Sequence, residues 1–244
     1  MNEFLKRSGY TAAETSHILS LMLKNHFDIC YEVDGNYLIP LCMSEILPAH
    51  EFDMKDAIQL LFKYEVMPSG MVARVLVRLS DMIEGDMISK TSGIFHYENN
   101  KAKIEEYYSS ESNRFIRISV IGDKKGRKHL LYIIRRELIK VQKDWFENLE
   151  VSEFIPCICN ECKQAEKPYL FDKKKLQKSL SKGTLSKECG ESDDSINIFE
   201  LFGEVYDLGG NVSVNSFNDL ITQDYQWARS LVTLLFSFYP KHFL

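Results

Sequence analysis

The chain has 244 residues, of which 45% are hydrophobic and 27% charged, and its formal net charge at pH 7 is −5. This composition predicts a soluble globular protein with one large or two modest domains, and the negative charge gives no general attraction to nucleic acid. No apolar run reaches the roughly 18 to 20 residues that cross a bilayer, and the N-terminus lacks the apolar segment of a secretory signal. We therefore expect a cytoplasmic protein with no membrane partner.

The first predicted elements are a helix and a β-hairpin. Thr11 and Glu14 have the spacing of a capping box, so a helix should follow them. Two β-rich runs then flank Asp34-Gly35-Asn36, three residues that tolerate the backbone of a tight turn. A helix followed by a hairpin is typical of the end of a winged-helix unit, to which we assign residues 1–50.

Residues 51–202 are predicted to form a second, larger unit. Pro68-Ser69-Gly70 should start an amphipathic helix over residues 71–83. Its polar face, which carries Arg74, Arg78 and Asp81, is expected to be a solvated, ion-paired surface.

An antiparallel meander and a long helix are expected next. The runs SGIFHYE, KIEEYY and RFIRISVI are short, aromatic and β-branched, which favours strands. Alternation in the third run should turn Ile116, Ile118 and Val120 to the core and leave a wet face with Phe115, Arg117 and Ser119. A helix over residues 127–146 should pack on this sheet, giving an α+β fold.

The stretch IPCICNECK places three cysteines within six positions. Cys157, Cys159 and Cys162 could supply three ligands of a structural zinc ion, and Cys189, followed by Gly190, is the natural fourth because the segment contains no histidine. The stretch between them is rich in lysine, which favours thiolates. The sequence therefore predicts a four-cysteine zinc knuckle within residues 155–190.

Other interpretations of the cysteines stay open. Cys159 and Cys162 form a CxxC pair that could be redox active, although no βαβ unit surrounds it, and the four thiols could also bind nothing. Cys30 and Cys42 lie in apolar stretches and are expected to be buried thiols.

The signatures of common catalytic sites are missing from the sequence. It contains no GxxxxGK[ST] phosphate loop, no GxGxxG after a strand, no HExxH and no GxSxG. We therefore expect a non-catalytic protein.

The order of motifs resembles the COR region of Roco proteins. A hairpin ending in YLIP precedes FKYEVMPSG and a helix with RVLVRL, followed by the meander, LLYIIRRELIKV, IPCICNEC, KPYLFD and a distant cysteine. The resemblance runs from about Asp28 to about Phe202. It implies that residues 1–50 hold the C-terminal part of the first COR subdomain and residues 51–202 the second, with residues 203–244 as an extension of unknown role. The family tends to have a tryptophan where this meander starts with SGIFHY.

In Roco proteins COR follows a Ras-like GTPase domain called Roc, packs against it, mediates dimerisation and relays the nucleotide state. The resemblance thus implies a dimerisation and coupling module of a Roco-type GTPase signalling protein, with a Roc-type GTPase domain and a second copy as partners. GTP binding is not carried over, because no residue here matches the Roc phosphate loop. The chain is then expected to be a COR fragment or a split gene product.

The alternative is a nucleic-acid-binding protein built from a winged helix and a zinc knuckle. Lys173-Lys174-Lys175 could then meet phosphates. The predicted recognition helix offers only Lys24 as a cation, however, so nucleic acid is not the expected partner.

Overall fold

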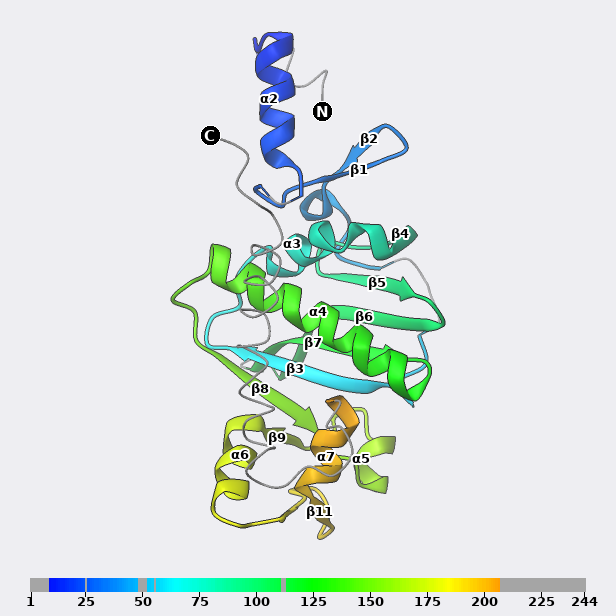
Figure 1. The fold of residues 1–244 in the computed structure, drawn as a ribbon, viewed down its shortest axis with the longest axis vertical. Coiled ribbons are helices and arrows are strands. Elements are labelled where there is room, and N and C mark those ends of the chain that lie inside the picture. Colours follow the sequence, from blue (N-terminus) through cyan, green and yellow to red (C-terminus); the bar gives the residue numbers. More distant parts are fainter. Residues whose placement is uncertain (1–8, 25, 48–51, 55, 111–112, 207–244) are drawn as a thin grey trace, which may run out of the picture.

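The computed structural model describes residues 9–24, 26–47, 52–54, 56–110 and 113–206. Along its longest axis, the described part has the N-terminal helix and hairpin at one end, a sheet with helices in the middle, and the cysteine-bearing segment at the other end (Figure 1). The predicted extension 203–244 lies outside the described residues from residue 207 onward.

The N-terminal unit, residues 9–42, contains the predicted helix and hairpin. Helix α2 (Ala12–Met22) begins at a capping box: the Thr11 hydroxyl accepts from the Glu14 backbone N–H at 3.3 Å, and the Glu14 carboxylate accepts from the Thr11 N–H at 2.8 Å. Strands β1 (Tyr31–Val33) and β2 (Asn36–Leu38) pair around Asp34 and Gly35, which both have positive φ. The winged-helix assignment itself stays a prediction.

A seven-stranded antiparallel sheet forms the centre of the molecule. In the order in which they pair, its strands are β4 (Ile83–Ile88), β5 (Ser92–Tyr97), β6 (Asn100–Ser110), β7 (Asn113–Ile121), β3 (Ile58–Tyr64), β8 (Val151–Pro156) and β9 (Leu170–Asp172). Strands β5, β6 and β7 confirm the predicted meander. Strand β3, which the sequence did not predict, lies between β7 and β8 and joins the meander to the cysteine-bearing segment.

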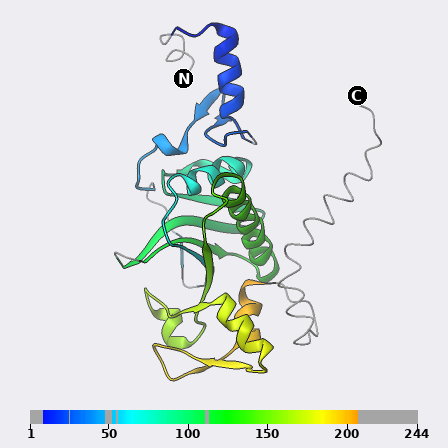
Figure 2. The same ribbon diagram turned by 90° about the vertical axis from the view of Figure 1, so that its left-hand side faces the viewer.

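Helices α3 (Met71–Arg78), α4 (Lys124–Trp145) and α7 (Ile198–Val205) lie over one face of this sheet, and α6 (Lys173–Ser181) packs against β8 and β9. Figure 2 shows α4 packed on one side of the strands. The apolar side of α4 is buried as predicted, through Leu130, Ile134, Leu138 and Val141. Helix α3 begins after Gly70, whose φ of 79° suits glycine, but it ends five residues earlier than predicted. After the short 3-10 helix η2 (Ser80–Met82), the chain enters β4.

The second face of β7 was expected to be exposed to solvent, and this expectation was wrong for two residues. Phe115 is only 4% exposed and Ser119 is fully buried. The Phe115 ring packs edge-on against Phe154 of β8 at 5.9 Å. Arg117 behaves as expected for a polar position, because its guanidinium pairs with Glu105 at 2.5 Å. Side chains of nearby strands, such as Phe154 of β8 and Tyr107 of β6, therefore cover part of the second face of β7.

The cysteines outside the cluster differ from each other. Cys30 is buried as expected, whereas Cys42 is exposed at the end of the 3-10 helix η1 (Pro40–Cys42), so the prediction for Cys42 was wrong. An apolar neighbourhood in the sequence does not bury a residue in a short connecting helix.

A buried charge cluster ties the sheet to three other elements. The Glu153 carboxylate on β8 accepts hydrogen bonds from Arg135 of α4 at 3.0 and 3.1 Å, from Lys173 at 3.1 Å, and from the Tyr206 hydroxyl at 3.2 Å. We call these four residues the Glu153 cluster. Burial opposes the charge of Glu153, but the two cations outweigh burial and lower its pKa to about 2. The cluster therefore holds an ionised carboxylate at the centre of the fold.

We predict that Glu153→Gln lowers the free energy of unfolding at pH 7 by about 3 kcal/mol, because it leaves Arg135 and Lys173 buried without their anion. A pKa depressed in the folded state stabilises the protein above the unfolded value of 4.5 and loses that contribution as the pH falls toward 2. Urea unfolding at pH values from 7 to 3 measures the free energy of unfolding of both proteins. The difference between wild type and variant should therefore become smaller as the pH falls. The exposed pair of Glu45 with Lys90 provides the control, since Glu45→Gln should change stability by less than about 0.5 kcal/mol. A constant difference at all pH values would contradict the assignment.

Candidate metal centre

The four cysteines come from two separate turns of the chain. Cys157 follows strand β8, Cys159 caps the N-terminus of helix α5 (Asn160–Gln164), and Cys162 lies inside that helix. Cys189 follows strand β10 (Ser186–Glu188), which pairs with β11 (Ser195–Asn197). Helix α6 (Lys173–Ser181) lies between the two turns in sequence. We call residues 157–197 the cysteine unit.

The structure brings these four thiols together. Their sulfur atoms all lie within 4.8 Å of one another, and all four side chains are buried. The Cys162 and Cys189 sulfurs are 3.5 Å apart, and those of Cys159 and Cys189 are 3.9 Å apart. A tetrahedral zinc ion with bonds of about 2.3 Å spaces its sulfurs by about 3.8 Å, whereas a disulfide requires about 2.05 Å. The spacing fits a shared cation, and the thiols are free.

Backbone donors surround the sulfurs. The N–H groups of Cys159 and Cys162 each donate to the sulfur of the preceding cysteine at 3.4 Å, and the N–H of Tyr169 donates to Cys162 at 3.4 Å. The N–H of Glu191 donates to Cys189 at 3.5 Å. Because such donors favour charged sulfur, the local fold is suited to thiolate ligands.

The thiol pKa values differ because burial and these donors act in opposite directions. Burial raises the pKa of Cys162 to about 11 and also raises that of Cys157. At Cys189 burial also opposes ionisation, but hydrogen bonds from Glu191 and Ser192 outweigh it and lower the pKa to about 6. Four thiolates this close repel one another, so a cation among them would favour the ionised form of all four.

Gly190 is required for a steric reason. A Cβ atom at this position would lie 2.3 Å from a ring carbon of Tyr169, and no positive φ is involved. The Tyr169 ring itself packs edge-on against Phe171 of β9 at 4.9 Å. The glycine therefore lets the Cys189 turn close over the segment that follows the first three cysteines.

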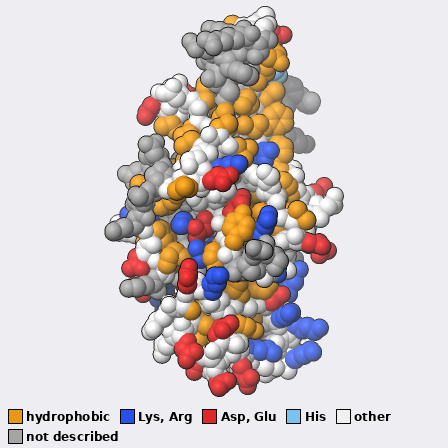
Figure 3. Space-filling model, turned by 180° about the vertical axis from the view of Figure 1, so that it is seen from behind, with side chains coloured by type: hydrophobic (Ala, Val, Ile, Leu, Met, Phe, Trp, Pro, Cys, Tyr) orange, Lys and Arg blue, Asp and Glu red, His pale blue; other side chains and the backbone are white. Residues whose placement is uncertain are grey.

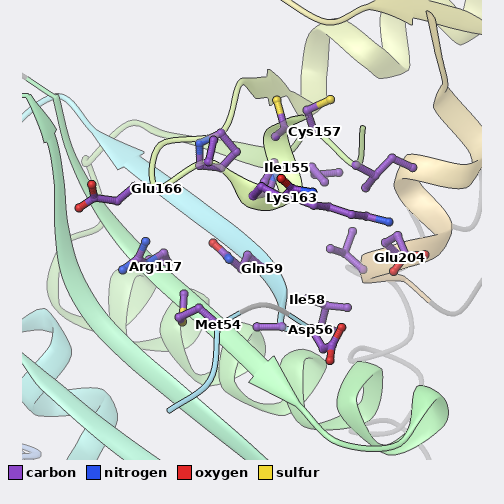
Figure 4. Close-up of a pocket in the computed structure, with 18 of the residues that line it drawn as sticks. Met54, Asp56, Ile58, Gln59, Arg117, Ile155, Cys157, Lys163, Glu166 and Glu204 are labelled. Carbon is purple, nitrogen blue, oxygen red and sulfur yellow. The ribbon is translucent and has the colours of Figure 1, made fainter. Parts of the chain in front are cut away.

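A cleft of about 610 Å³ lies beside the cluster, and Cys157 and Cys162 form part of its wall. Figure 4 shows Arg117, Gln59, Lys163 and Glu166 around it, with the sulfur of Cys157 directed away from Arg117 and Gln59. Its described lining residues include cations and carboxylates but no histidine, serine or tyrosine.

The surroundings of Cys159 and Cys162 differ from those of a thioredoxin-like pair. All strand pairings of the described sheets are antiparallel, so no βαβ unit surrounds the CxxC sequence in this part of the chain. The two cysteines instead share their space with Cys157 and Cys189. This arrangement favours the metal-binding interpretation over the redox one.

Together, these features define an α+β domain whose antiparallel sheet carries helices on one face and whose far end holds a four-cysteine cluster that could bind a metal ion. The family model "C-terminal of Roc, COR-B domain" matches residues 55–204, and the chain belongs to this family. The suspected COR resemblance is confirmed. COR domains occur in Roco proteins alongside a Roc GTPase domain. The match begins after the N-terminal unit, whose assignment to the first COR subdomain stays a prediction.

A search of curated proteins found no significant match to the chain. Within the described residues, no helix is both long enough and apolar enough to span a membrane.

We predict that Gly190→Ala destabilises the protein by about 1 to 3 kcal/mol, because the new methyl group overlaps the Tyr169 ring. The same substitution in a Tyr169→Ala background should cost much less, since the ring that it meets is gone. Thermal unfolding of the two single variants and the double variant measures this coupling. Strictly additive effects would show that the close approach of these two residues does not restrain the turn.

Proposed function

We propose that this protein is a non-catalytic module that couples and dimerises a Roco-type GTPase system, with a Roc-type GTPase domain as its partner. Membership of the COR-B family supports the link to Roco proteins. The observation that carries the coupling role is a buried ionic contact between the N-terminal unit and the sheet-bearing unit. Coupling requires that one unit cannot move without the other, and this contact supplies that constraint.

The contact centres on Asp28, whose carboxylate is completely buried. It accepts hydrogen bonds from Arg78 of α3 at 2.8 Å and from the Trp145 indole at the end of α4 at 3.2 Å. Arg78 also pairs with Asp144 at 2.7 Å. We call these four residues the Asp28 joint. The polar face after Gly70 was expected to be a solvated, ion-paired surface: it is ion-paired, and Asp81 is exposed, but the expectation of solvation was wrong for Arg78, which the N-terminal unit covers.

Arg74 extends the same contact. Its guanidinium lies 4.0 Å from the centre of the Trp145 ring and donates to the backbone carbonyl of Phe27. The Phe27 ring also packs against Trp145, with ring centres 6.0 Å apart. Cationic, aromatic and hydrogen-bonding contacts therefore converge on one indole.

Helix α4 provides a route from this joint to the cysteine unit. Its last residues form part of the Asp28 joint, Arg135 at its middle binds Glu153, and Arg127 near its start pairs with Glu204 of α7 at 3.4 Å. A helix of 22 residues is about 33 Å long. A displacement of the N-terminal unit would thus act on a rigid element that also contacts α7 and the strand leading to the cysteines.

Asp28→Asn should loosen the N-terminal unit, because it removes the buried anion that Arg78 requires. We expect faster amide hydrogen exchange in residues 12–38, with the exchange of β6 and β7 unchanged. Asp81→Asn is the matched control: Asp81 also pairs across the two units, with Lys24 at 2.5 Å, but it is 81% exposed. Equal exchange changes in both variants would contradict a special role of the Asp28 joint.

We further propose that Cys157, Cys159, Cys162 and Cys189 hold one structural zinc ion. The sulfur spacing and the backbone donors support this assignment, and zinc is the usual ion of all-cysteine tetrahedral sites. When bound, the ion would supply a cross-link between the α5 turn and the β10–β11 hairpin. The module would then keep its far end folded without catalytic chemistry.

Protein purified without chelator should contain about one zinc ion per chain. Cys159→Ser should lower both the zinc content and the melting temperature, because a structural ion contributes directly to folding. Cys42→Ser removes an exposed thiol outside the cluster and should change neither. Elemental analysis and thermal unfolding provide the two measurements; full stability without metal would refute the proposal.

The dimerisation role should appear as a dimer mass in light scattering at tens of micromolar. The candidate surface is the aromatic end of the meander, where Tyr108 is half exposed and lies under Arg114 at 5.6 Å. Tyr108→Asp should weaken the dimer, whereas Tyr10→Asp, at a similarly exposed tyrosine of the N-terminal unit, should not. A monomer mass for the unaltered protein would remove dimerisation from the proposed function.

No observation favours the nucleic-acid alternative for α2. Lys24, the cation expected to serve a recognition helix, is paired with Asp81.

A further inference from the structure

The lysine run that begins helix α6 is divided between the interior and the surface. Lys173 is buried against Glu153, and Leu176 and Leu180 face the core. Lys174, Lys175, Lys178 and Lys182 are exposed. Residues three and four positions apart share one side of a helix, so these four lysines form a single stripe, which we call the lysine stripe.

The lysine stripe is not neutralised by the rest of the described chain. The side-chain ammonium groups of these four lysines form no ion pair or hydrogen bond with a described residue. Among the other exposed lysines, Lys90 pairs with Glu45 and Lys140 with Glu137, whereas Lys124, Lys125 and Lys143 of α4 are exposed and form no ion pair with a described residue, so the stripe is distinguished by its clustering on one helix face. Because like charges on one helix face destabilise it, the fold alone gives no reason for this arrangement.

Four acidic residues of the cysteine unit lie in the turn between β10 and β11 and its flanks, namely Glu188, Glu191, Asp193 and Asp194. Another, Asp172, caps the start of α6, where its carboxylate accepts from the Lys175 backbone N–H at 3.1 Å. Figure 3 shows lysine side chains gathered at one side of this end of the molecule and acidic side chains gathered at its tip. One side of the unit is therefore cationic although the whole chain is acidic.

The residue types indicate what kind of anion the stripe would meet. Residues 137–206 contain no arginine, the side chain whose planar fork suits bidentate contacts with bases or single phosphate groups. Lysine is a mobile point charge that suits a diffuse anionic surface. Leu185 follows the stripe in the turn after α6 and is 50% exposed, so it could enter the apolar edge of such a surface.

We propose that the lysine stripe, with Leu185 beside it, docks the cysteine unit onto the surface of a membrane that contains anionic lipids. This differs from the expectation, based on the lack of a spanning segment, that the protein has no membrane partner. Each lysine near an anionic leaflet strengthens binding by roughly fivefold, so four lysines give reversible, salt-sensitive attachment. Leu185 adds a small apolar contribution that salt does not screen.

The test is sedimentation of the full chain with vesicles of phosphatidylcholine alone and with about 30% phosphatidylserine. Binding is expected only to the anionic vesicles, and it should weaken strongly when the salt concentration rises to about 0.5 M. Equal binding to both vesicle types, or no binding to either at low salt, overturns the proposal.

Two triple variants test whether binding depends on the lysine stripe or only on the net charge of the chain. Lys174→Gln, Lys178→Gln and Lys182→Gln together should weaken binding at least tenfold, with the circular dichroism spectrum and melting temperature retained. The control Lys124→Gln, Lys125→Gln and Lys143→Gln removes the same charge from exposed positions of α4 and should change binding less than about twofold. Equal losses in the two variants would overturn the assignment to this surface. Tighter binding to duplex DNA than to anionic vesicles at the same salt would assign the stripe to nucleic acid instead.

Discussion

The fold depends on one buried negative charge. Glu153 lies on the helix-covered face of the sheet, where burial alone would keep a carboxyl group neutral. Its ionised form requires Arg135 from α4, Lys173 from α6 and the Tyr206 hydroxyl after α7 to approach at the same time. A buried carboxylate without these partners would cost several kcal/mol of folding free energy. The charge of Glu153 therefore favours the packing in which α4, α6 and the residue after α7 all meet β8.

The contacts of Glu153 also affect the position of the four cysteines. Helix α6, which begins at Lys173, lies between Cys162 and Cys189 in the chain. The position of α6 therefore determines whether Cys189 can reach the first three cysteines. The Lys173–Glu153 pair fixes the start of α6 against the sheet, and the Tyr169–Gly190 contact then brings the two cysteine turns together. Both contacts therefore help to hold the two cysteine turns close together.

Local patterns in the sequence predicted much of this structure, and long-range contacts account for most of what they missed. The Thr11 cap, the meander and the four cysteines each depend on spacing over a few positions, which a sequence displays directly. Strand β3 is buried on both faces at Leu60, Leu61 and Phe62, so it lacks the alternation that identifies a half-buried strand. The sequence could not show that Lys173, rather than Lys174 or Lys175, would be buried. The three neighbours are identical residues, and they differ only in the side of the helix on which they lie.

Helix α4 is the element on which the two buried charge clusters converge. Asp144 and Trp145 at its end contribute to the Asp28 joint, and Arg135 at its middle contributes to the Glu153 cluster. Apolar contacts alone would allow neighbouring elements to slide, because the hydrophobic effect has no direction. Hydrogen-bonded ion pairs fix both distance and angle, and breaking one leaves a buried charge without a partner. Both ends of the molecule are thus held in a defined orientation to the same helix, as the proposed coupling role requires.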